Sequence, residues 1–113
     1  LETDKWSDKI DAGLQYHADN HFEPDMTPRY YDHRLYPVDI HNFAQGIITF
    51  LAFGYSDKAL KLIEKSVDMM WDSGRHYFYY QKKRTYTNRI NYIRWSQAWM
   101  FYALAKYLKE AGR

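Results

Sequence analysis

Two stretches without a formal charge, residues 40–56 and 95–105, constrain the fold of this chain most strongly. Both are shorter than the ~20 apolar residues that a bilayer-spanning helix needs, so we expect a soluble chain with no membrane partner. In the first stretch, apolar side chains recur at helical spacing and the opposite face is uncharged too. A helix without charge on either face is usually buried all round. The sequence therefore predicts two buried helices, over residues 39–53 and 94–110.

Two further helices are predicted to be one-sided. In residues 3–19 and 57–72, apolar side chains form a single stripe, and charged side chains cover the rest of each helix. Such helices lie at the surface of a domain. Residues 20–38 contain all three prolines and read as a long connection. In the second long connection, residues 76–91 read as a small β-hairpin around a basic tip.

The order of these segments repeats with an offset near 52 residues. A charged helix is followed by a long connection and an uncharged helix, and the unit then recurs. The segment Phe43-Ala44-Gln45-Gly46 aligns with Trp95-Ser96-Gln97-Ala98 as aromatic, small, glutamine, small. Repetition at this period is typical of stacked helical hairpins. We therefore predict an all-α fold of two stacked antiparallel hairpins, with both long connections and both uncharged helix starts at one end.

Composition excludes several classes of function. The 113 residues are enough for one domain, spanning 1–113. A net charge of +2 gives no electrostatic footprint for nucleic acid. The chain has no cysteine, so a thiolate zinc site is excluded. His17 and His21 are four residues apart, but Asp19 points away from them, and we predict no metal and no cofactor. A cytoplasmic location is favoured, and the start at Leu1 suggests a chain cut from a longer protein.

Three segments carry a resemblance to a known family. "YPVDIHNFAQGIITF", "YFYYQKK" and "INYIRWSQAWMFYALAKYL" resemble the C-terminal part of six-hairpin (α/α) toroid proteins, most closely bacterial ones from polysaccharide-related gene neighbourhoods. Some of those carry the label "delta-aminolevulinic acid dehydratase", which does not fit, because the genuine dehydratase is a TIM barrel that uses two lysines. The resemblance spans roughly residues 1–112. It implies a fragment or domain of about a third of a toroid, since six hairpins at about 50 residues each exceed this chain.

The resemblance also implies where a ligand would bind. In related toroids, such as unsaturated glucuronyl hydrolases and sugar epimerases, the inner helix starts line a sugar-binding cleft. By position, this similarity implies catalytic roles for Asp39 and His41. It implies substrate-binding roles for Asn42, Gln45, Arg94, Trp95 and Gln97.

Each of these residues also has a structural interpretation. Asp39 is a natural helix N-cap, and His41 can be a hydrogen-bonded packing residue. Arg94 can bind a carboxylate with its fork or form a salt bridge between helix starts. The glutamines can pair with a neighbouring carbonyl group.

The predicted function is therefore to act on or bind carbohydrate, with acidic polysaccharide or oligosaccharide as the candidate ligand. If the chain is an enzyme, it resembles a glycoside hydrolase, lyase or epimerase. The alternative is a non-catalytic helical-repeat module that binds a protein. Expected partners are a carbohydrate ligand and either the remaining helices of a longer chain or a second copy. An incomplete toroid should leave an apolar face open or self-associate.

Overall fold

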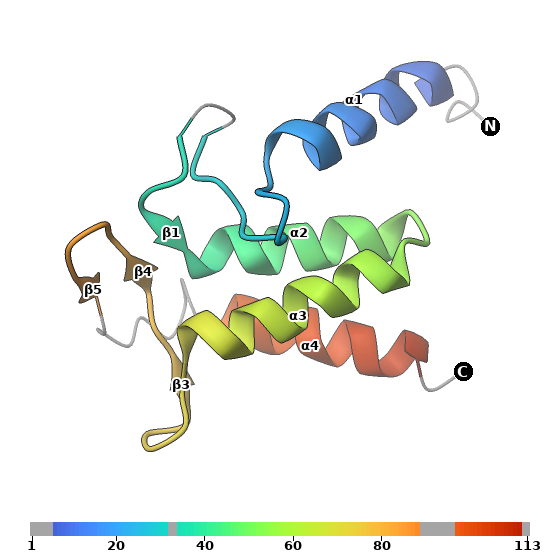
Figure 1. Cartoon of the computed structure of the whole chain (residues 1–113). Coiled ribbons are helices and arrows are strands. Elements are labelled where there is room, and N and C mark those ends of the chain that lie inside the picture. Colours follow the sequence, from blue (N-terminus) through green and yellow to red (C-terminus); the bar gives the residue numbers. More distant parts are fainter. Residues whose placement is uncertain (1–5, 32–33, 89–96, 112–113) are drawn as a thin grey trace.

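The structure is a computed structural model that describes residues 6–31, 34–88 and 97–111. In these ranges, helices α2, α3 and α4 lie side by side, α1 lies apart from them above α2, and the strands gather at the end where α2 begins (Figure 1). The elements in chain order are α1 (Ser7–Asn20), β1 (Val38–Asp39), α2 (Ile40–Ala52), α3 (Ser56–Met70), β2 (Trp71–Asp72), β3 (Tyr77–Phe78), β4 (Gln81–Lys82), β5 (Thr87–Asn88) and α4 (Ala98–Ala111).

The predicted all-α fold is wrong. The described residues form four helices together with two small antiparallel sheets, so the fold is mixed rather than a stack of helical hairpins. One sheet has the strand order β1-β4-β5, and the other pairs β2 with β3. The physical reason is that tyrosine- and threonine-rich segments favour extended backbone, and here they find partners beyond their own hairpin.

The predicted β-hairpin within residues 76–91 is present only in part. Gln81 pairs with Asn88 and Lys82 with Thr87 in an antiparallel register. Tyr77 and Phe78, expected in the same hairpin, instead pair back onto Trp71 and Asp72. Lys82 is thus a strand residue, and the tip of the hairpin is formed by residues 83–86.

Helix α2 is the centre of the core. It contacts both α3 and α4, and its side chains Phe43 and Ile47 are fully buried. Gly46 explains how closely the helices approach, because a Cβ placed there would lie 2.8 Å from Leu62 of α3. The prediction of a buried helix over 39–53 is therefore confirmed in part: α2 buries more of its residues than α1 or α3, but His41 and Gln45 are exposed.

The first long connection also enters the core. The ring of Phe22 is 6% exposed, and its centroid lies 5.4 Å from that of Phe50. Helix α1, by contrast, has no buried residue, and its N-terminal apolar side chains Trp6 and Ile10 are 46% and 39% exposed. Only the C-terminal half of α1, through Leu14 and Ala18, packs against the core.

The prediction that the fourth helix is buried all round is wrong. In α4, Met100 and Ala103 are buried, whereas Phe101 is 74% and Leu108 is 69% exposed. Helix α3, expected to lie further out, buries more of its residues: Ala59, Leu62, Ser66 and Met70. Among the described elements, α4 packs mainly against α2 and α3, and these leave Phe101 and Leu108 exposed.

The two long connections do meet at one end of the helices. Strand β1, which ends the first connection, pairs with β4 of the second, with Val38 opposite Lys82. This agrees with the predicted placement of both connections. Within the described ranges, no helix is long and apolar enough to cross a bilayer.

Candidate functional site

Asp39 is occupied by structural contacts. It is 7% exposed, and its carboxylate Oδ1 accepts a hydrogen bond of 2.7 Å from the backbone N–H of His41. Its Oδ2 accepts a second bond of 2.8 Å from Nε2 of Gln81. The first contact is the N-cap of α2, and the second ties β1 to β4. These contacts support the structural interpretation of Asp39 and leave its proposed acid–base role without support.

His41 lies on the surface, next to the start of α4. Its side chain is exposed, and its ring centroid lies 5.5 Å from that of Trp99. Trp99 is itself 41% exposed. The two rings therefore form an open aromatic platform. The carboxylate of Asp39 contacts the backbone N–H of His41 and the side chain of Gln81. The predicted catalytic role of His41 stays a prediction.

Gln97 holds the second connection onto the helices. Its Oε1 accepts a hydrogen bond of 2.9 Å from the N–H of Phe78, and its Nε2 donates one of 2.7 Å to the carbonyl oxygen of Phe78. This pairing confirms the alternative that a glutamine at this position satisfies a nearby backbone group. Arg94 and Trp95 lie outside the described residues, so the predicted polar depression that they share with Asp39 stays a prediction.

Asn42 and Gln45 meet two histidines in a small hollow. The hollow measures about 80 Å³ and lies between the end of α1, the first connection and α2. Asn42 donates a hydrogen bond of 3.1 Å to the carbonyl oxygen of Arg29. Gln45 is exposed. The residues that line this hollow are His17, His21, Phe22, Pro28, Arg29, Tyr30, Asn42 and Gln45.

The histidine pair is the unusual feature of this hollow. Nε2 of His17 and Nδ1 of His21 are buried and have no hydrogen-bond partner in the part of the chain that the structure describes. Burial lowers the pKa of His17, and the charge of a protonated His21 lowers that pKa further. His17 therefore favours its neutral form. The spacing of four residues was visible in the sequence, but the hollow was not, because Asn42 and Gln45 come from another helix.

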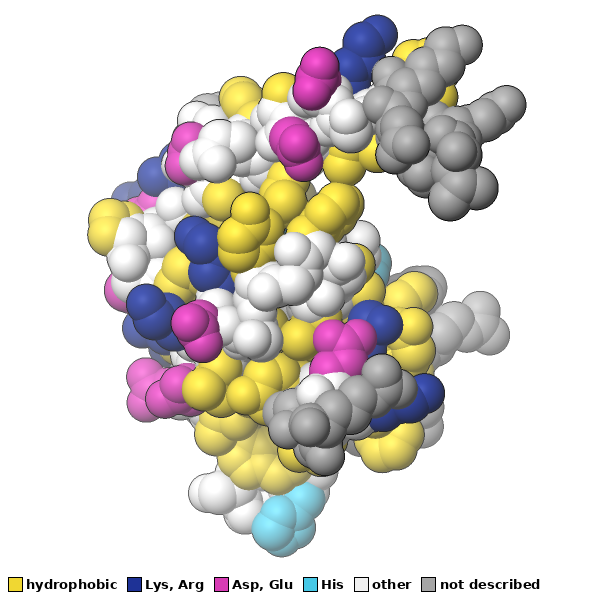
Figure 2. Space-filling model, turned by 90° about the vertical axis from the view of Figure 1, so that its right-hand side faces the viewer, with side chains coloured by type: hydrophobic (Ala, Val, Ile, Leu, Met, Phe, Trp, Pro, Cys, Tyr) yellow, Lys and Arg dark blue, Asp and Glu magenta, His cyan; other side chains and the backbone are white. Residues whose placement is uncertain are grey.

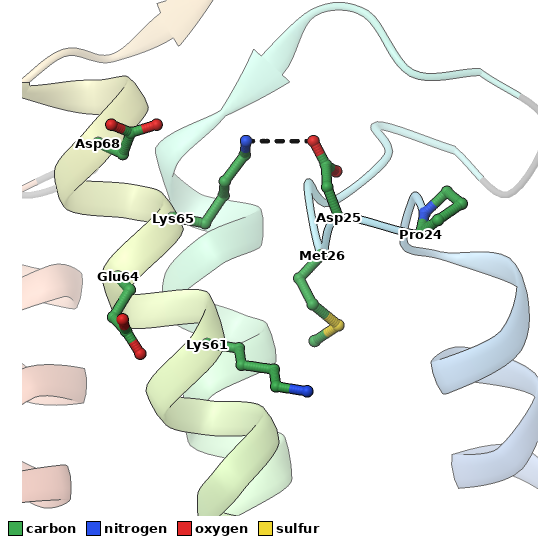
Figure 3. Close-up of a pocket in the computed structure, with 7 residues that line it drawn as sticks. All are labelled: Pro24, Asp25, Met26, Lys61, Glu64, Lys65 and Asp68. Atoms are coloured by element: carbon green, nitrogen blue, oxygen red, sulfur yellow. Dashed lines mark ion pairs between the residues drawn. The ribbon is translucent and has the colours of Figure 1, made fainter.

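A larger hollow lies between the first connection and α3. It measures about 580 Å³, and Lys65 reaches across it to Asp25, with Nζ 3.1 Å from Oδ2 (Figure 3). The pKa of Asp25 is lowered first by the backbone N–H of Thr27, then by the Thr27 hydroxyl and by Lys65. Positive and negative side chains nearly balance here, so the hollow has no strong preference for either ion. Its lining comprises Pro24, Asp25, Met26, Lys61, Glu64, Lys65 and Asp68.

The outward side of α4 carries several exposed aromatic and aliphatic side chains. Tyr102 is 52% exposed, between Phe101 and Trp99, and its ring lies 6.4 Å from that of Trp99. Hydrophobic side chains cover much of the lower half of the molecule in Figure 2, at the level of α3 and α4. We call the following residues the α4 outer face: Ala98, Trp99, Phe101, Tyr102, Ala105 and Leu108, all exposed.

A comparison with models of known protein families gives no match, and comparisons with curated protein sequences and with solved structures give none either. The resemblance to six-hairpin toroids therefore rests on the three sequence segments alone.

Proposed function

We propose that this chain is a non-catalytic association module and that its α4 outer face docks against the same face of a second copy. The observation that carries this proposal is the exposure of a continuous apolar stripe on α4. Ala98, Phe101, Ala105 and Leu108 follow the alternating spacing of three and four residues. This spacing lines up on one side of a helix and forms the seam of paired helices.

The exposed area suits a partner. The four large side chains of the α4 outer face expose roughly 500 Å², near the upper end of the 300–600 Å² found for the largest apolar patch of a typical monomer. A standard interface buries about 800 Å² on each partner. The α4 outer face therefore provides most of the area that a stable dimer needs, and the side chains around it would supply the rest.

The distribution of charge favours a second copy in antiparallel orientation. The charged side chains of α4 are Lys106, Lys109 and Glu110, all in its C-terminal half. Lys106 is already paired with Glu110 at 3.3 Å. In an antiparallel pair, the two sets of charges lie at opposite ends, each beside the uncharged N-terminal half of the other helix. No like charges then face each other.

Sedimentation velocity over a range of concentrations tests this proposal. We expect the wild type to dimerise, and Leu108→Glu or Phe101→Glu to shift it to a monomer, because each places a charge in the seam. Ile10→Glu is the matched control, since Ile10 is also 39% exposed and lies on α1, which is on the other side of α2 from α4 (Figure 1). A wild type that stays monomeric at every concentration contradicts the proposal.

Carbohydrate binding is a second candidate, supported by the platform of Trp99 and His41. An exposed indole beside an imidazole offers a sugar ring an apolar surface to stack on and a polar group to bind. Glycan-array binding by the wild type, lost in Trp99→Ala, supports this function. Leu108→Glu separates the two candidates, because it should break the dimer and leave glycan binding intact. The absence of any glycan signal counts against this second function alone.

A further inference from the structure

His17 and His21 stand one helical turn apart at the end of α1. The backbone N–H of His21 donates to the carbonyl oxygen of His17 at 3.0 Å, so helical geometry is kept between them. Their ring centroids are 5.0 Å apart. Residues four apart on a helix lie on the same face, which directs both imidazoles into the hollow beside α2.

Each imidazole presents a nitrogen that the surrounding protein leaves unused. A buried polar atom without a hydrogen bond is costly, and buried side-chain polar atoms normally have a partner. Nε2 of His17 and Nδ1 of His21 break this rule together, in one hollow. A ligand that accepts two imidazole lone pairs would satisfy both nitrogens at once.

We propose that His17 and His21 bind one divalent first-row transition-metal ion, of the class of Zn²⁺, through Nε2 of His17 and Nδ1 of His21. Two histidines at i and i+4 on one helix face are a known zinc-binding arrangement. Zinc–nitrogen bonds of about 2.0–2.1 Å, at a tetrahedral angle, place two imidazole centroids about 5 Å apart. The ring centroids of His17 and His21 are 5.0 Å apart, close to that value.

The remaining ligands come from neutral oxygens. Among the described residues, no group of three or more His, Cys, Asp or Glu side chains is placed to hold a metal. Asn42 and Gln45 of α2 also line the hollow and carry amide oxygens. The positive charge of Arg29, which lies nearby, is compensated by Glu23, whose carboxylate is 2.6 Å from Nε of Arg29. The site therefore has two imidazoles and room for amide oxygens or water.

The test titrates the whole chain with zinc chloride alone at pH 7.5. Isothermal titration calorimetry should give one site per chain. A ¹H–¹⁵N spectrum of the histidine side chains identifies the ligating atoms without any substitution. We expect the resonances of Nε2 of His17 and Nδ1 of His21 to shift, and those of the exposed His41 and His76 to stay in place.

Two substitutions and a matched control complete the experiment. His17→Gln and His21→Gln should each weaken zinc binding at least tenfold, whereas His41→Gln should leave it unchanged. Circular dichroism without metal verifies that each variant is folded. The proposal is overturned if wild-type zinc binding is absent at millimolar concentration, or if the zinc-dependent shifts fall on other histidines.

Discussion

The side chain of Gln97 and the backbone of Phe78 form two hydrogen bonds, one in each direction. The N–H of Phe78 reaches Oε1 at 2.9 Å, and Nε2 reaches the carbonyl oxygen at 2.7 Å. The side-chain amide of Gln97 thereby satisfies the backbone groups of Phe78 as the backbone of a neighbouring strand would. Since Phe78 is 5% exposed, water is a poor substitute for either contact. Gln97 thus fastens β3 to the start of α4.

Replacing Gln97 with Leu should destabilise the protein by about 1–3 kcal/mol, the cost of leaving buried polar groups without partners. Urea denaturation followed by circular dichroism measures this change. Gln45→Leu is the control, because the exposed Gln45 forms no such pair, and surface changes stay within about 0.5 kcal/mol. Equal effects of the two substitutions would show that the hydrogen bonds to Phe78 contribute nothing specific.

Asp39→Ala should lower the free energy of unfolding by about 0.5–2 kcal/mol, because α2 loses its N-cap. Asp39→Asn should lose much less, since asparagine caps helices about as well as aspartate. The comparison of the two variants by urea denaturation separates the cap from the charge. If stability is untouched in Asp39→Ala, the carboxylate is free for another role.

Gly46→Ala should destabilise the protein by about 1–3 kcal/mol, the usual cost of overpacking a core. The added methyl group would lie 2.8 Å from Leu62 and 3.1 Å from Phe22, both of which are buried. Gly13→Ala is a matched control in α1, where an added Cβ would meet no described atom within 4 Å apart from its chain neighbours and the backbone of its own helix. There the better helix propensity of alanine should raise stability by up to about 1 kcal/mol. Thermal unfolding of both variants measures the contrast, and a stabilised Gly46→Ala would contradict the close approach of α2 and α3.

Stability should fall as the pH drops below 6.5. The folded state lowers the pKa of His17 below its ordinary value of 6.5, mainly by burial. Between the lowered pKa and 6.5, the unfolded chain binds a proton that the folded chain does not. The free energy of unfolding therefore rises with pH across this window. Above pH 6.5, the stability that was lost at low pH is fully restored. Urea denaturation at pH 7.5 and pH 5, with a chelator present, measures the difference.

His17→Gln should reduce this difference, because glutamine does not titrate, and His41→Gln should keep it. Asp25 does not interfere, since its pKa is lowered from 3.8 and its effect lies at more acidic pH. If stability depends on pH equally in the wild type and in His17→Gln, groups other than His17 cause the pH dependence.

Helix α2 and its N-cap were determined by the sequence itself. The apolar spacing from Ile40 to Leu51 and the position of Asp39 are local properties, and the structure places the helix at Ile40–Ala52. The contacts between strands, by contrast, join segments that are far apart in the sequence. Asp39 and Gln81 are 42 residues apart, and the sequence around either residue does not predict its contact with the other. The all-α prediction failed for this reason, because strand formation depends on the partner that a segment meets.

Helix α4 likewise has one property that the sequence predicts and one that depends on the tertiary structure. Its lack of charge from Ala98 to Ala105 was evident from the sequence, but whether both faces are covered depends on how many neighbours the fold supplies, and α2 and α3 cover only one. The hollow at His17 and His21 also combines a local property with a tertiary one. Their spacing along α1 was local information, whereas the burial of their free nitrogens required Asn42 and Gln45 of α2 to close the site. Periodicity and capping act within a few residues, so the sequence by itself determined them. Burial, strand pairing and the environment of a side chain are sums over distant neighbours, and only the tertiary structure decided them.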